Sequence, residues 1–257
     1  MSPSTPSVSS NIKNGADLEA QVTISPRDQP ALPYVPRNFA NPAPLGLTAF
    51  ATSIFMISLM NLHPRGVAEP NIIVSTMIMF GGLCQYISGI MEFVTGNTVC
   101  LSYTCFIGKL QSLMLTLKFG ATVFSSFAGF NVAYALIFIP GTGIMAAYED
   151  PATGKPLPEL NQAIAMFVWT WFMVCCIFTV ASTRASWALL LLFIFVDLDL
   201  LFVATYHMTG INSISTASSV FGFISAFLAY YAGAAGLWGN GGTAINLPVG
   251  SLAVKYE

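Results

Sequence analysis

Six long apolar segments, separated by short breaks rich in charge, Pro or Gly, constrain how this chain can fold. They cover residues 45–62, 72–94, 120–139, 163–183, 188–207 and 214–237. An α-helix needs about 20 apolar residues to cross the roughly 30 Å hydrocarbon core of a bilayer. A helix also satisfies its own backbone hydrogen bonds in lipid. The sequence therefore predicts an all-α integral membrane protein with six transmembrane helices.

The composition supports a membrane protein and argues against several other classes. Only 8% of the residues are charged and 55% are hydrophobic, whereas a soluble chain carries roughly 25% charged residues. No basic stripe indicates a nucleic-acid partner. No C-x-x-C pair, metal-ligand cluster or Ser/His motif is present, so we expect no metal, no cofactor and no enzymatic activity. His63 and His207 lie near span ends, where we expect them to be solvated.

The distribution of positive charge predicts the orientation. Of the nine Lys and Arg residues, only Arg65 and Lys155 fall on one side of the six spans. The excess on the opposite side, which includes both chain ends, predicts that the N- and C-termini are cytoplasmic. Residues 1–40 are rich in Ser, Pro and Asn and are expected to form a disordered cytoplasmic tail. Residues 41–238 then form the transmembrane domain, and residues 239–257 a cytoplasmic C-terminal tail.

The first span opens with Asn-Pro-Ala-Pro-Leu-Gly-Leu at residues 41–47. Asn41 is a favourable N-cap, and proline is tolerated in the first turn of a helix. The positive end of the helix dipole attracts carboxylates. The motif is therefore either a capped helix start alone or part of a site for an anionic substrate.

This opening motif resembles the acetate uptake transporter family, which includes bacterial succinate–acetate permeases, fungal acetate transporters and proteins proposed to export ammonia. Residues 81–85, 96–98, 139–144 and 195–198 resemble further parts of the family pattern, and the resemblance covers about residues 38–250. It implies a homo-hexamer in the plasma membrane with a narrow pore in each subunit.

Residues 99–118 interrupt the family pattern. The family passes directly from Gly-Asn-Thr to the Phe-Gly motif found here at Phe119 and Gly120. Lys109 divides the inserted stretch into two apolar pieces that are each too short to span a bilayer. We hypothesise that these residues derive from a retained intron, and the alternative is a genuine cytoplasmic or interfacial loop.

Polar groups in the spans are candidates to replace the hydration water of a small carboxylate, because an unsolvated charge in hydrocarbon is costly. Besides Asn41, these are Thr48, Gln85, Ser125, Ser126 and Asn131. The family resemblance implies an apolar constriction at Phe50, Phe127 and Leu198. The chain departs from the family by having Phe127-Ala128 in place of Tyr-Gly, and Asn131 in place of Trp.

Three carboxylates lie within the spans. Asp197 and Asp199 point about 200° apart on a helix with 3.6 residues per turn, so they cannot form one paired site. Asp197 matches fungal relatives and is a candidate for proton coupling or for a helix–helix hydrogen bond, whereas Asp199 stands where the family has Thr. Glu92, near the cytoplasmic end of the second span, is a second candidate for proton coupling.

The sequence thus predicts membrane transport of small monocarboxylates such as acetate, with succinate or other short acids as further substrates and with proton coupling as an option. Ammonia or ammonium export and a membrane sensor that does not transport are the alternatives. The expected partners are a small carboxylate, membrane lipid and further copies of the chain, without nucleic acid.

Overall fold

The computed structural model describes residues 40–67, 71–102, 109–239, 247–250 and 252. For residues 95–102 and 109–118 it describes the backbone alone. The predicted tail at residues 1–40 lies outside the described residues apart from Ala40, and so does most of the predicted C-terminal tail.

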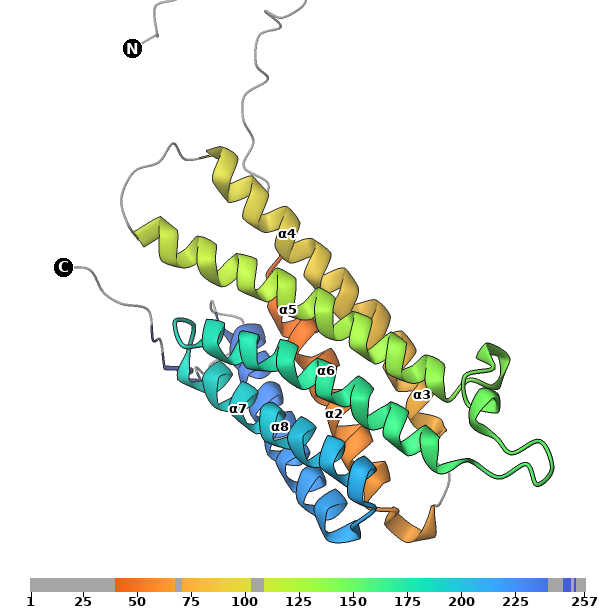
Figure 1. The fold of residues 1–257 in the computed structure, drawn as a ribbon. Helices are drawn as coiled ribbons and strands as arrows, with labels where there is room; N and C mark the ends of the chain where they lie inside the picture. The colour runs from red at the N-terminus through yellow and green to blue at the C-terminus, as the bar shows by residue number, and fades with distance from the viewer. Residues whose placement is uncertain (1–39, 68–70, 103–108, 240–246, 251, 253–257) are drawn as a thin grey trace, which may run out of the picture. The chain divides into compact units, whose positions relative to one another are not determined.

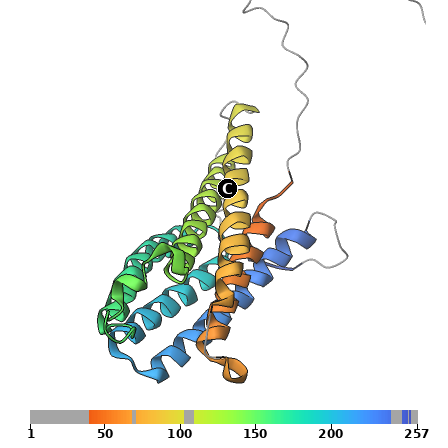
Figure 2. The ribbon, with the colours of Figure 1, turned by 90° about the vertical axis from the view of Figure 1, so that its right-hand side faces the viewer.

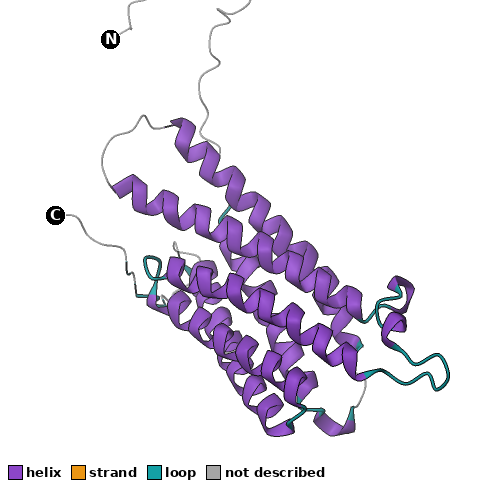
Figure 3. Cartoon of the chain, in the orientation of Figure 1, coloured by secondary structure: helices purple, strands orange, loops and turns teal. Residues whose placement is uncertain are grey.

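Six helices in the described residues are long and apolar enough to cross a membrane, which confirms the predicted fold class. The first is α2 (Ala43–Asn61), and the second joins α3 (Ile72–Thr76), a π-helix η2 (Met77–Cys84) and α4 (Gln85–Ser102). The others are α5 (Lys109–Ile137), α6 (Pro158–Ser182), α7 (Trp187–Thr209) and α8 (Asn212–Trp238). Figure 3 shows helices joined by loops, and no strand occurs in the described part of the chain.

The predicted spans agree with the helices except at two starts and one end. α6 begins at Pro158, five residues before the predicted start, because Pro and an acidic residue such as Glu159 both favour the first turn of a helix. α5 begins at Lys109, within the insertion, and α4 continues to Ser102. The backbone on either side of residues 103–108 is therefore helical, and the origin of the insertion stays a hypothesis.

Helix packing brings the spans together in a fixed order. α8 packs against both α2 and α7, α6 packs on α7, and α4 packs on α5 (Figures 1 and 2). α2 also contacts η2 and α4, so it joins α6, α7 and α8 to the pair formed by α4 and α5. This arrangement leaves side chains of α2, α5, α6, α7 and α8 facing a common interior space.

Side-chain caps and a left-handed glycine define several helix ends. The Asn41 carboxamide oxygen accepts a hydrogen bond of 3.1 Å from the Ala43 amide, as expected for a residue at the start of a helix. Ser186 caps α7 by accepting a hydrogen bond from the Leu189 amide. Gly210 ends α7 with a φ of 71°, a conformation that glycine adopts without steric cost. α8 begins two residues later, so α7 and α8 form a tight hairpin.

Candidate functional site

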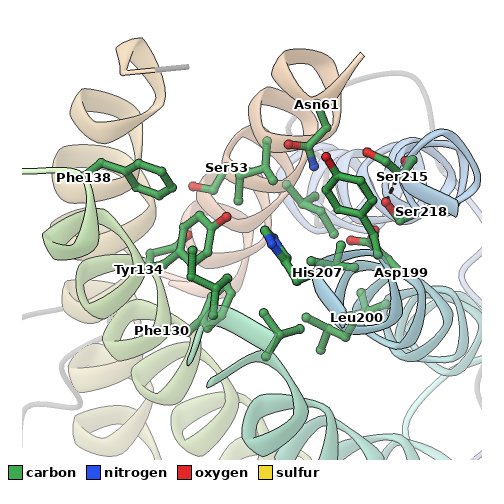
Figure 4. Close-up of a pocket in the computed structure, with 18 of the residues that line it drawn as sticks. Ser53, Asn61, Phe130, Tyr134, Phe138, Asp199, Leu200, His207, Ser215 and Ser218 are labelled. Carbon is green, nitrogen blue, oxygen red and sulfur yellow. Dashed lines mark hydrogen bonds between the residues drawn. The ribbon is translucent and has the colours of Figure 1, made fainter. Parts of the chain in front are cut away.

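A cavity of about 300 Å³ lies between α2, α5, α6, α7 and α8 (Figure 4). Its lining extends on α2 from Phe50 to Asn61 and on α7 from Val196 to His207. At 1.5 Å per residue, each of these stretches covers about 16 Å along a helix axis. The linker residues His63 and Met145 also line the cavity. It therefore reaches the end of the bundle where α2 connects to α3 and α5 connects to α6.

Aromatic side chains line the end of the cavity that lies deepest in the bundle. The rings of Phe50 and Phe127 meet edge to face, with centroids 4.9 Å apart, and both side chains are buried. Phe127 also contacts the rings of Phe178 on α6 and Phe193 on α7. Two of the three residues predicted to form a constriction are thus in contact at one end of the cavity.

A buried polar cluster lies beside these rings. The Asn131 amide nitrogen donates to the Gln85 carboxamide oxygen at 3.1 Å and to the carbonyl oxygens of Gly81 and Phe127 at 3.3 and 3.0 Å. Asn131 lines the cavity, whereas Gln85 is fully buried behind it, with an amide nitrogen that has no hydrogen-bond partner. Ser53 of α2 lines the cavity next to Gly81. Asn131 therefore exposes part of an interhelical amide cluster to the cavity.

The two aspartates of α7 have different surroundings. Asp199 lines the cavity, is 8% exposed and makes no hydrogen bond within the described residues. Asp197 instead accepts a hydrogen bond of 2.6 Å from the Thr179 hydroxyl of α6. The predicted divergence of the two carboxylates is confirmed, and the position of Asp197 is consistent with the helix–helix hydrogen bond that was one of its two interpretations.

Polar side chains gather at the opposite end of the cavity from the phenylalanine pair. Asn61, Tyr206, His207 and Ser215 contribute to this end, and in the view of Figure 4 His207 lies between Tyr134 and Asp199. The Nδ1 atom of His207 is buried without a hydrogen-bond partner. His207 is therefore only partly solvated, in contrast to the expectation, because its side chain is half-buried and this atom is shielded from solvent within the bundle.

Several predicted site residues lie outside the lining of this cavity. Leu198 is absent from it because the α7 side chains that face the cavity are Val196, Asp199, Leu200, Val203, Tyr206 and His207. Asn41 caps α2, and Thr48 donates to the Pro44 carbonyl of its own helix. Glu92 is 4% exposed and lies near Gly120.

The two serines before Phe127 also differ from the prediction. The Ser125 hydroxyl lies against Gly89 of α4 and is buried without a hydrogen-bond partner, so it faces a neighbouring helix. Ser126 is not among the residues that line the cavity.

Sequence reasoning missed Ser53, Tyr134 and the site position of His207. The helical repeat could have located them, because positions three, four or seven residues apart share one face of a helix. Counting from Phe50 in this way reaches Ser53, Ile57 and Asn61, and counting from Phe127 reaches Tyr134.

Comparison with known proteins agrees with this architecture. Accumulation of dyads protein 2 from Saccharomyces cerevisiae is 33% identical over 84% of this chain and 66% of its own length. Acetate permease A from Emericella nidulans is 31% identical over 83% of this chain and 66% of its own length. Ammonia transport outward protein 2 from S. cerevisiae is 31% identical over 84% of this chain and 66% of its own length. The matches thus span just under two thirds of these three relatives.

A solved structure shares the fold. The structure of the bacterial acetate channel SatP superposes with a TM-score of 0.64 at 21% sequence identity and covers 83% of this chain and 100% of that chain. The sequence profile of the GPR1/FUN34/yaaH family matches residues 22–254, which is most of the chain. The chain is therefore a multi-pass integral membrane protein that belongs to the GPR1/FUN34/yaaH family.

Proposed function

We propose that the chain carries small monocarboxylates, acetate foremost, across a membrane by way of the cavity and the Phe50–Phe127 contact. The observation that carries this proposal is a cavity within a membrane-spanning bundle that runs from polar side chains at the end of the bundle, such as Asn61 and Ser215, to the Phe50–Phe127 contact. Acetate has a charged head and a methyl group, so polar groups can replace its water while a narrow apolar passage excludes larger hydrated ions. The names of Acetate permease A and the SatP acetate channel support this substrate class.

Four further features belong to the same proposal. Short acids other than acetate, including succinate, are secondary substrates, and the site of action is the plasma membrane. Each subunit of a homo-hexamer contains its own pathway. Phe50 and Phe127 form the constriction, with Val196 or Leu200 as the third contributor in place of Leu198, because these two α7 residues face the cavity.

Ammonium export is the second candidate function. A relative named Ammonia transport outward protein 2 supports it. Within the structure, the cavity combines aromatic faces such as Phe130 and Tyr134 with the Asp199 carboxyl, and both features favour a small cation. A sensor that no longer transports is the remaining alternative.

Uptake of labelled acetate at neutral pH, in a host that lacks its own acetate permease, tests the proposal. Truncating Phe50 to Ala should admit longer acids such as butyrate and reduce the preference for acetate several-fold, because the edge-to-face contact with Phe127 is removed. Phe50→Leu is the milder variant, since Phe→Ala in a core costs about 3–5 kcal/mol of stability.

Phe55→Ala is the matched control, because Phe55 lies on the same helix but packs against Phe223 and Phe227 and does not line the cavity. Unchanged selectivity in both Phe50 variants would contradict the constriction. The chain should also be compared with a version that lacks residues 99–118. Absence of uptake by both forms would favour the sensor, and ammonium efflux without acetate uptake would favour the second candidate.

A further inference from the structure

Asp199 is a buried carboxyl group without a partner that faces the cavity. It is 8% exposed, and no hydrogen bond joins it to another described residue. By contrast, the neighbouring carboxyl of Asp197 is held by the Thr179 hydroxyl and does not line the cavity. Asp199 is thus the acidic group of α7 that a molecule in the cavity can reach.

The groups around Asp199 leave its charge uncompensated. Tyr134 of α5 and Cys175 of α6 lie close enough to interact with it electrostatically, and His207 lies eight residues further along α7. Ser58 of α2 and Gly222 of α8 pack nearby and cannot ionise at physiological pH. His63 and Tyr206 are the other titratable groups in the lining, which contains no Lys or Arg among the residues described.

An ionised carboxylate in this position is costly and hinders an anionic substrate. A buried charge without a partner loses its hydration, and it repels a second negative charge in the same low-dielectric space. Uptake of one proton by Asp199 removes both effects. Intramembrane carboxyl groups that face a cavity are characteristic of proton pathways in transporters.

We propose that Asp199 binds the proton that accompanies the substrate, an inference that rests on the proposed transport of monocarboxylates. The Asp199 carboxylate takes one proton from the solution at the polar end of the cavity and becomes neutral. A carboxylate anion then enters, and the proton passes from Asp199 to the substrate, breaking one O–H bond and forming another. The neutral acid leaves past Phe50 and Phe127, so each cycle moves one anion and one proton and returns Asp199 to its ionised form.

Acetate-driven currents in proteoliposomes on a solid-supported membrane test this step. Wild-type protein should give no net current, because proton and anion move together, and passive diffusion of acetic acid is electrically silent. Asp199→Asn removes the proton site and the repulsion, so acetate should move as an ion and produce a current where wild type produces none. In cells, wild-type uptake should fall as the external pH rises and the carboxyl ionises, whereas Asp199→Asn uptake should stay level.

Two further variants keep the test interpretable. Asp199→Glu retains a carboxyl and should behave like wild type. Asp199→Thr also removes the carboxyl and replaces Asp199→Asn in the test if the Asn variant misfolds. Glu159→Gln is the matched control, because Glu159 is an exposed carboxyl in the first turn of α6 and does not line the cavity.

Different failures point to different errors. Absence of acetate uptake by the wild type would overturn the proposed function and this inference together. If the wild type takes up acetate, and Asp199→Asn and Asp199→Thr give the same currents and pH profiles as the wild type, the role of Asp199 alone would be overturned. Loss of pH dependence in Asp197→Asn but not in Asp199→Asn would assign the proton to Asp197. If the wild type carries an ammonium current that Asp199→Asn abolishes while acetate uptake is unaffected, Asp199 would bind a cation larger than a proton.

Discussion

At the scale of single residues, two helical glycines differ in how much space surrounds the Cβ position. A Cβ atom at Gly81 of η2 would overlap the Ser53 hydroxyl and lie 2.8 Å from the Asn131 amide carbon. A Cβ atom at Gly129 of α5 would meet nothing within 4 Å. Gly81 therefore allows α2, η2 and α5 to approach each other beside the cavity.

Substituting Gly81 with Ala should destabilise the protein by about 1–3 kcal/mol, because a closely packed core has no room for an added methyl group. It should also lower transport by displacing Ser53 and Asn131. Gly129→Ala is the matched control and should leave stability unchanged or slightly raised, since Ala favours a helix more than Gly. Thermal unfolding of the detergent-purified variants measures both effects, and equal melting temperatures would contradict the close approach at Gly81.

At the scale of helices, α6 and α7 are joined by a tight turn and by a side-chain hydrogen bond. The Thr179 hydroxyl also lies within 3.1 Å of the Cys175 carbonyl of its own helix, so it contacts acceptors on both α6 and α7. In lipid, helix association depends on packing and on such interhelical bonds. The hydrogen bond from Thr179 of α6 therefore fixes the position of the Asp197 carboxyl.

Thr179→Val should weaken the α6–α7 contact by about 0.6 kcal/mol and by no more than about 1.7 kcal/mol, the range for interhelical hydrogen bonds in membranes. Thr179→Ser keeps the hydroxyl and should retain wild-type stability. Reversible unfolding in mixed micelles gives the comparison. If Val and Ser variants unfold at the same denaturant concentration, the bond contributes nothing measurable.

At the scale of the whole molecule, the linkers after α2, α5 and α7 all lie on one side of the six spans. The polar end of the cavity reaches this side through His63 and Met145. The distribution of Lys and Arg predicts that this side faces away from the cytoplasm. The cavity would then open toward the outside and be closed toward the cytoplasm by the phenylalanine pair.

Cysteine labelling tests this orientation. With a membrane-impermeant maleimide on intact cells, Lys155→Cys should react, whereas Arg184→Cys should react only after permeabilisation, because these exposed residues lie in linkers on opposite sides. Wild-type protein, with its native cysteines, sets the background. Labelling of Arg184→Cys in intact cells would reverse the topology and the direction in which the cavity opens.

The sequence by itself determined the six membrane-spanning helices and their all-α class, because length, apolar composition and sparse charge are local properties that lipid enforces on each segment separately. It also indicated that Phe50 and Phe127 belong to one site, through a family resemblance. Only the tertiary structure decided that Asp199 faces the cavity, that Asp197 bonds to Thr179 and that Leu198 lies outside the lining. These outcomes depend on how each helix is rotated against its neighbours, and helices apolar on nearly every face carry too weak a periodic signal to set that rotation.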